Sequence, residues 1–340
     1  MDSQTQQTEQ TEQAPHQKRL DEHKYPVLSL PNEIVSEIFI QCLPPYPACP
    51  PVRGPSSPTC LTHICRKWRD IALTTPQLWR AIPFRAAGNP HVQAWLERSR
   101  SCPLSIFWDE SNVFGHWPPP KSLKTIIRHH ERWEYANLTI DWMSGQPFLL
   151  EGPMPLLSEL FLRMDDVDRF AQPRVKTRDF PKLRTLSLLH CSVHLGDWLP
   201  WAQLTSLTLS DVNPTYNPRY ATCTSILQRA VNLIHLKIIN CTVNQHEQLT
   251  LPHLESLMMF SQSRFCQNLD ILPIDTFAAF ISRSGCRLQK VLITGGGIHQ
   301  TSKAAFRNHF AEIPQITFNS QYNWFSRWDG DEEDSGDDSG

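Results

Sequence analysis

Long apolar runs are missing from this chain of 340 residues, and their absence limits what it can be. No stretch approaches the ~18 uninterrupted apolar residues of a membrane-spanning helix, so we expect no membrane-embedded segment. Residues 1–17 are rich in Gln, Thr and Glu and lack the apolar stretch of a secretory signal. We therefore expect a protein of the cytoplasm, the nucleus or both.

Metal-binding and nucleotide-binding motifs are also lacking. None of the ten cysteines stands at Cys-x-x-Cys spacing, so we interpret them as reduced thiols, mostly buried as small apolar side chains. His129-His130-Glu131 has no second ligand pair, Asp165-Asp166-x-Asp168 lacks a calcium loop, and Gly295-Gly296-Gly297 lacks the Gly-Lys-Ser/Thr ending of a phosphate loop. We expect no metal, no cofactor and no catalytic residue, although a Cys/His pair formed only by folding stays open.

A strong excess of charge of one sign is absent as well. Lys and Arg number 32 and Asp and Glu number 34, which gives a formal net charge of −2 and disfavours a nucleic-acid partner. The balance is uneven, because residues 329–340 hold seven acids and no base, so that residues 1–328 sum to +5. We interpret the acidic end as a solvated tail.

The chain changes character along its length. Residues 1–25 are polar and without periodicity, and we expect them to be disordered. A helical region is predicted over residues 26–82, with an extended loop at residues 44–58, where seven of fifteen residues are proline. Short apolar triplets occupy residues 89–318, and residues 319–340 form the expected acidic, disordered tail.

The apolar triplets share one spacing: an apolar residue, two others, a second apolar residue, one other, and a third. The six clear matches are Leu157/Leu160/Leu162, Leu183/Leu186/Leu188, Leu204/Leu207/Leu209, Leu233/Leu236/Ile238, Leu254/Leu257/Met259 and Leu288/Val291/Ile293. Weaker matches are Leu104-Ser105-Ile106, Tyr135/Leu138/Ile140 and Ile316-Thr317-Phe318. Most of the intervals lie within or close to the 20–29 residues typical of leucine-rich repeats. That repeat class has Asn or Cys three residues after the third position, which Cys191 and Cys241 match and Asp165, Val212, Gln262 and Gly296 do not.

This spacing predicts an α/β solenoid with short parallel strands. Alternation within each strand sends the second and third apolar side chains inward and the residue between them outward. One strand cannot bury its inward face alone, so the array is stable only when the strands stack. The alternative is an ordinary α/β domain with a parallel sheet. On the solenoid interpretation the outward residues form a concave surface for a protein substrate, namely Phe161, Ser187, Thr208, Lys237, Met258 and Leu292.

Three short helices are expected before the repeats. The first runs from Pro31 to Cys42, the second from Thr59 to about Ala72, and the third opens at Thr75-Pro76. A unit of this size buries only about 60% of its surface, so we expect apolar side chains to be left for a partner. The alternative is that the unit docks on the repeats.

The helical segments carry a resemblance to a known motif. Residues 30–39, Leu-Pro-Asn-Glu-Ile-Val-Ser-Glu-Ile-Phe, resemble the opening of an F-box. Residues 64–72, Ile-Cys-Arg-Lys-Trp-Arg-Asp-Ile-Ala, and residues 75–79, Thr-Pro-Gln-Leu-Trp, resemble its second and third helices. The proline-rich insertion and residues 95–106 are similar to those of F-box proteins from mushroom-forming fungi.

This resemblance implies a non-catalytic adaptor. F-box proteins bind a Skp-type adaptor, and through it a cullin, and they present a protein substrate for ubiquitin transfer. The side chains that we expect to contact the adaptor are Leu30, Pro31, Ile34, Ile38, Ile64, Trp68, Leu78 and Trp79. Leu61, Cys65 and Ile71 are assigned equally well to the motif's own core. The alternatives are a repeat scaffold with a degenerate F-box, and a hydrolase or metal enzyme.

Overall fold

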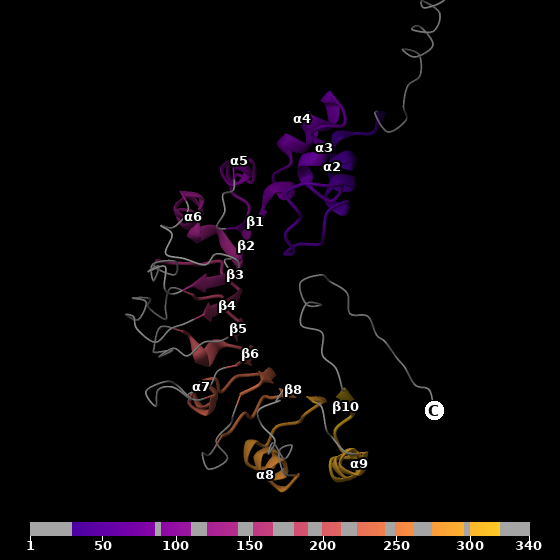
Figure 1. Ribbon diagram of the computed structural model, residues 1–340, viewed down its shortest axis with the longest axis vertical. Helices are drawn as coiled ribbons and strands as arrows, with labels where there is room; N and C mark the ends of the chain where they lie inside the picture. The colour runs from indigo at the N-terminus through magenta and orange to yellow at the C-terminus, as the bar shows by residue number, and fades with distance from the viewer. Residues whose placement is uncertain are drawn as a thin grey trace, which may run out of the picture.

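The computed structural model describes residues 29–85, 90–109, 121–141, 152–165, 180–189, 199–211, 223–241, 249–261, 274–295 and 300–319. Within these residues the chain is an α/β protein built on a single sheet of ten strands. All strands are parallel, and each pairs with the strand before it in the chain. The sheet curves into an arc, and helices α5, α6 and α7 lie on its convex side (Figure 1).

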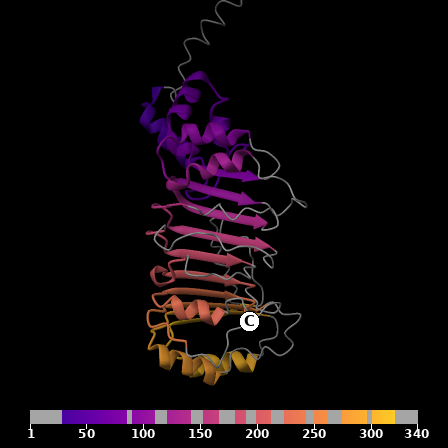
Figure 2. The same cartoon turned by 90° about the vertical axis from the view of Figure 1, so that its left-hand side faces the viewer.

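The strands run side by side with their carboxyl ends on one edge (Figure 2). Their bounds are β1 Ala81–Arg85, β2 Leu104–Asp109, β3 Trp133–Asp141, β4 Glu159–Asp165, β5 Thr185–Leu189, β6 Ser206–Ser210, β7 His235–Ile239, β8 Ser256–Ser261, β9 Lys290–Gly295 and β10 Gln315–Asn319. The helices are α2 Asn32–Gln41, α3 Pro58–Leu61, α4 Arg66–Thr74, α5 His91–Arg98, α6 Lys121–Ile127, α7 Cys223–Arg229, α8 Ile274–Ser284 and α9 Gln300–His309, with short 3-10 turns η2 Pro76–Trp79, η3 His130–Arg132 and η7 Trp201–Gln203.

Inward side chains of successive strands stack in columns. The in-register pairs make one column from Ile82 through Ile106, Ala136, Leu160, Leu186, Leu207, Leu236, Leu257 and Val291 to Ile316. A second column begins at Phe84 and ends at Phe318, two residues further along each strand. These columns run through the buried core, so burial of one strand depends on its neighbours.

The six clear triplets correspond to strands β4–β9, so the predicted parallel α/β arrangement is confirmed for this part of the chain. Strand β3 corrects the prediction made from Tyr135, Leu138 and Ile140. There the buried apolar residues are Trp133, Ala136 and Leu138, and Tyr135 is only half-buried. The triplet was missed because a tryptophan and an alanine replace the expected leucines.

The sheet begins earlier than the sequence indicated. Strand β1 at Ala81 pairs with β2, although the repeats were predicted to start at residue 89. Trp79, Ile82 and Phe84 have the same spacing as the later triplets and are all buried. Aromatic residues at the first and third positions concealed this unit from a search for leucine.

The predicted second helix is two helices. Helix α3 ends at Leu61 and α4 begins at Arg66, because Cys65 has an extended backbone with φ −153° and ψ 170°. The backbone N–H of Trp68 donates to Cys65 Sγ at 3.5 Å, so Cys65 caps α4. The predicted third helix is the 3-10 turn η2, and the first helix is confirmed as α2.

Some predictions lie outside the described residues or at their limit. Residues 1–25, the glycines 296–297, Cys191 and most of residues 319–340 are not among those described. Asn319 was assigned to the acidic tail, but it is the last residue of β10.

Candidate functional site

Helix α2 exposes an apolar strip. Val35 and Phe39 face the core, and Ile34 and Ile38, four residues apart on another face of the helix, lie in solvent. Large exposed apolar side chains in the described part of the chain are Ile34, Ile38, Ile64 and Val231, at 49, 42, 54 and 40% exposure. Three of these four therefore belong to the unit of α2, α3, α4 and η2, which we call the helical unit.

Ile64 owes its exposure to the break between α3 and α4. It lies in the short connection just before the extended Cys65, so its side chain belongs to neither helix. The Arg69 Nε–H donates to the Thr62 carbonyl at 2.7 Å and ties α4 to this connection. The connection is thus held in place although Ile64 itself, at 54%, is more exposed than Ile34, Ile38 and Val231.

Trp68 is half-buried within the helical unit. Its ring packs edge-to-face on Phe39 of α2, with the ring centroids 4.9 Å apart. This contact joins α2 to α4, so Trp68 is chiefly a core residue with an exposed part. Leu30 is half-buried and Pro31 is exposed at the start of α2, where Lys67 Nζ donates to the Leu30 carbonyl at 3.2 Å.

Leu78 and Trp79 are corrections to the predicted contact set. Their exposed fractions are 1 and 0%, so neither offers surface to a partner. Trp79 occupies the first position of the β1 triplet, donates its indole N–H to the Ala72 carbonyl at 2.8 Å and packs on Trp95 of α5. The expectation that this tryptophan belongs to a free apolar patch is wrong, because it is part of the first layer of the stack.

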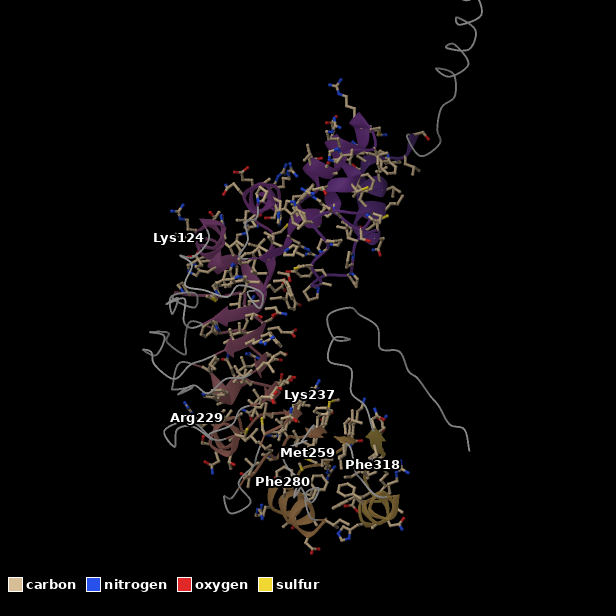
Figure 3. The ribbon with its side chains drawn as sticks, viewed as in Figure 1. Lys124, Arg229, Lys237, Met259, Phe280 and Phe318 are labelled. Carbon is tan, nitrogen blue, oxygen red and sulfur yellow. The ribbon has the colours of Figure 1, made fainter. Side chains whose placement is uncertain are left out.

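The predicted substrate residues form one continuous row. Phe161, Ser187, Thr208, Lys237, Met258 and Leu292 are direct neighbours in the pairing of strands β4–β9. All six are partly exposed, and we call them the middle row. Lys237 lies on the concave side of the sheet, away from Arg229 of α7 (Figure 3).

The proline-rich loop, residues 44–58, lies against the first strands of the sheet. Tyr46 donates its O–H to Glu134 Oε2 at 2.9 Å, and its ring packs on Tyr135 and under Arg80. The Ser105 hydroxyl donates to the Pro47 carbonyl at 2.6 Å, and the Cys49 thiol lies 3.8 Å from the Ser105 carbonyl. The loop therefore ties the helical unit to β2 and β3, a contact that no feature of the sequence had indicated.

The shifted titratable groups of this contact are explained by packing. Desolvation raises the pKa of the Cys49 thiol to about 12, and burial together with the Glu134 hydrogen bond raises the pKa of Tyr46. Neither group lines the groove of about 770 Å³ between the loop, α3 and the start of α5, where Cys60, His63 and His91 lie. Among the described residues, no three His, Cys, Asp or Glu side chains gather as metal ligands would.

Comparison of the chain with protein-family models, with curated proteins and with solved structures finds no match. None of the described helices combines the length and the apolar character needed to span a bilayer. The two surfaces above, the isoleucines of the helical unit and the middle row, are therefore the basis for a functional argument.

Proposed function

We propose that this chain is the substrate-recognition subunit of a Skp/cullin/F-box ubiquitin ligase. On this proposal the helical unit is an F-box that binds a Skp-type adaptor, and the strands form a leucine-rich-repeat-like array that holds a protein substrate. The chain itself catalyses nothing. It acts in the cytoplasm or nucleus by holding a lysine of the substrate near the activated ubiquitin on the conjugating enzyme. This raises the effective concentration of the two reactants.

The exposure of Ile34, Ile38 and Ile64 carries this proposal. Water-exposed isoleucines are costly, since burial of one such side chain contributes about 1.5–3 kcal/mol. Three of them gathered on one small unit favour an interface in which a partner covers them, as an amphipathic helix is covered in a groove. Leu30, Pro31 and the exposed part of Trp68 extend this surface, whereas Leu78 and Trp79 do not.

One observation favours the second candidate, a repeat scaffold that does not recruit ubiquitin machinery. Two of the eight expected contact residues, Leu78 and Trp79, are covered by the chain itself. The apolar surface left for an adaptor is therefore smaller than the sequence indicated.

The proposal is tested by measuring, with calorimetry, the binding of the full chain to a purified fungal Skp-type adaptor. We expect binding, and we expect Ile34→Asp/Ile38→Asp and Ile64→Asp to weaken it at least about tenfold each, because an anchor is lost and a charge must be desolvated. Val231→Asp is the matched control, since Val231 is an exposed apolar residue outside the helical unit. Trp68→Asp is less suitable, because it would break the contact with Phe39.

Two outcomes contradict the proposal. The first is no binding by the unaltered chain at micromolar concentrations, which favours the scaffold. The second is equal loss in the Ile34/Ile38 variant and in Val231→Asp while circular dichroism stays unchanged, since the isoleucines would then have no special role.

A further inference from the structure

The two edges of the sheet differ in how they meet solvent. Within the described residues, β1 and β10 each pair with one strand only. At the first edge, the Ser105 N–H of β2 donates to the Arg80 carbonyl, so by alternation along the strand the backbone groups of Pro83 point away from β2. Pro83 has no N–H, and its carbonyl accepts a hydrogen bond from His91 Nε2 at 2.9 Å. The β1 edge is therefore protected against a further strand.

Strand β10 has no such protection. Its sequence, Gln315–Asn319, contains no proline and no charged residue. The Gln315 N–H donates to the Gln289 carbonyl at 3.1 Å, so by the same alternation the backbone groups of Ile316 and Phe318 point away from β9. A strand edge of this kind is a template for pairing with another strand.

The two apolar columns of the core also end incompletely at β10. On β9, Val291 and Ile293 are 0 and 4% exposed, whereas their neighbours on β10, Ile316 and Phe318, are only half-buried. Phe318 lies at the end of the arc beside α9 (Figure 3), where Phe306 packs edge-to-face on its ring with the centroids 5.9 Å apart. A strand added beyond β10 would bury apolar surface that the chain's described residues leave open.

We propose that β10 pairs antiparallel with β10 of a second copy of this chain, about a twofold axis at Thr317. In this register Ile316 lies opposite Phe318 of the second copy. Both residues direct their N–H and C=O to the edge, so each such pair exchanges both hydrogen bonds, and the two threonines form the non-hydrogen-bonded pair at the centre. Gln315 lies opposite Asn319 of the second copy, so amides meet amides and apolar side chains meet apolar side chains.

Charge favours a second copy as the occupant. The strand is uncharged, so self-pairing places no like charges opposite each other. Each chain continues beyond Asn319 toward the seven acids of residues 329–340. Antiparallel pairing puts the two Asn319 residues at opposite ends of the paired strands, about 14 Å apart, which exceeds the screening length of about 8 Å at physiological ionic strength. A head-to-tail contact with β1 of another copy is disfavoured by Pro83 and its bond to His91.

This inference does not depend on the ligase role. The helical unit lies at the other end of the sheet from β10 (Figure 1), so pairing leaves Ile34, Ile38 and Ile64 uncovered. A twofold axis perpendicular to the sheet keeps the two concave faces on the same side. The pair of chains would therefore present one continuous concave surface, and a partner with two binding segments would be held by both copies.

Sedimentation equilibrium of the full chain, from about 1 to 200 μM, tests the pairing. One five-residue strand contributes less than the roughly 800 Å² per partner of a standard interface, so we expect a dissociation constant in the micromolar range. Thr317→Lys should raise it at least about tenfold, because two like charges would face each other. Thr208→Lys is the matched control and should leave it unchanged, since Thr208 lies in the same outward row on β6, which has a strand on each side.

A second variant tests the register. The Cα atoms of a non-hydrogen-bonded pair are about 4.5 Å apart, which a disulfide can span. Thr317→Cys should therefore give a covalent dimer when glutathione disulfide oxidises the two thiols and is itself reduced to glutathione. Thr208→Cys and the unaltered chain, whose native cysteines set the background, should give no comparable band on a non-reducing gel.

Three results overturn the proposal. One is a monomer at 200 μM in the unaltered chain; if deletion of residues 320–340 then produces a dimer, the chain's own end occupies the edge. Another is equal weakening of the dimer by Thr317→Lys and Thr208→Lys while circular dichroism stays unchanged. The third is the formation of assemblies larger than a dimer, which would indicate head-to-tail pairing. Adaptor binding measured on the same variants is expected to stay unchanged, so its loss in the unaltered chain bears on the ligase role alone.

Discussion

Trp79 fits two sequence patterns, the helical motif and the repeat spacing. In the helical motif it follows Leu78 at the end of the third segment, where an apolar side chain is expected to contact a partner protein. In the repeat spacing it stands three residues before Ile82 and five before Phe84, where it suits the core. The burial of Trp79 and its contacts with Ala72 and Trp95 favour the second pattern. A residue at the junction of two units is buried by whichever unit surrounds it.

Gly152 gives a prediction at the same scale. Its φ is +99°, and a Cβ placed on it would lie 2.7 Å from the His130 Nε2 atom. Gly54 has a similar φ of +103° and open space around it, so it is the matched control. We expect Gly54→Ala to cost about 1–3 kcal/mol from backbone strain alone. Gly152→Ala should cost about 1–3 kcal/mol more, because the His130 ring must move.

Urea unfolding of both variants measures this difference. In Gly152→Ala/His130→Ala the additional cost should disappear, since the clash has been removed, and a double-mutant cycle should give a favourable coupling. Equal costs for Gly54→Ala and Gly152→Ala would contradict the contact between Gly152 and His130.

At the scale of elements, the proline-rich loop has the least expected role. Its composition predicts only extended backbone, and its prolines reduce the entropy lost when it is ordered. Tyr46, Cys49 and Pro47 then join it to β2 and β3. The loop thereby ties the segment between α2 and α3 to the first strands of the sheet.

Alkaline pH should release this loop. The unfolded Cys49 thiol ionises near pH 9, but the folded thiol has a pKa of about 12, so the folded state holds its proton longer. The stability from this group is therefore complete below pH 9 and is lost as the pH rises toward 12. The raised pKa of Tyr46, from an ordinary value of 10.0, acts in the same direction.

Thiol labelling checks this expectation. At pH 8 the exposed Cys42 should react with iodoacetamide far faster than Cys49, and the ratio should fall above pH 9 beyond what thiol ionisation alone explains. Tyr46→Ala should raise Cys49 labelling already at pH 8, whereas Tyr46→Phe, which loses only the hydrogen bond to Glu134, should raise it less. Equal labelling of Cys42 and Cys49 at pH 8 would show that the loop is not held against the sheet.

For the whole molecule, the continuous columns predict cooperative unfolding. Leu186 lies in the middle of the column that runs from Ile82 to Ile316 and is fully buried, so Leu186→Ala should lower the free energy of unfolding by about 2–5 kcal/mol. Val231→Ala, at an exposed position, should change it by less than about 0.5 kcal/mol.

Hydrogen exchange locates the effect of Leu186→Ala. Because every strand depends on its neighbours, amide protection should fall in β1 and β9 as well as in β5. A loss confined to β4–β6 would mean that the array unfolds in separate parts.

The sequence predicted the sheet well where leucine occupies the inward positions and poorly elsewhere. The leucine triplets of β4–β9 repeat one spacing, and that spacing requires parallel strands stacked in chain order. Strand β1 and the frame of β3 were missed because Trp79, Phe84, Trp133 and Ala136 fill equivalent sites with other shapes. The sequence predicted α3 and α4 as one helix, because Cys65 falls on the apolar face of such a helix. Nothing in the sequence indicates that the backbone of Cys65 is extended.

In β4–β9 periodicity alone determined which side chains face inward and which form the middle row, because strand geometry alternates whatever the surroundings. Tertiary structure alone decided which apolar residues outside the repeats stay exposed. Ile34 and Ile38 remain in solvent while Trp79 is covered, and this depends on where α5 and the sheet lie relative to the helical unit. The docking of the proline-rich loop has the same origin, since its hydrogen bonds join residues that are 56 or more positions apart in the chain.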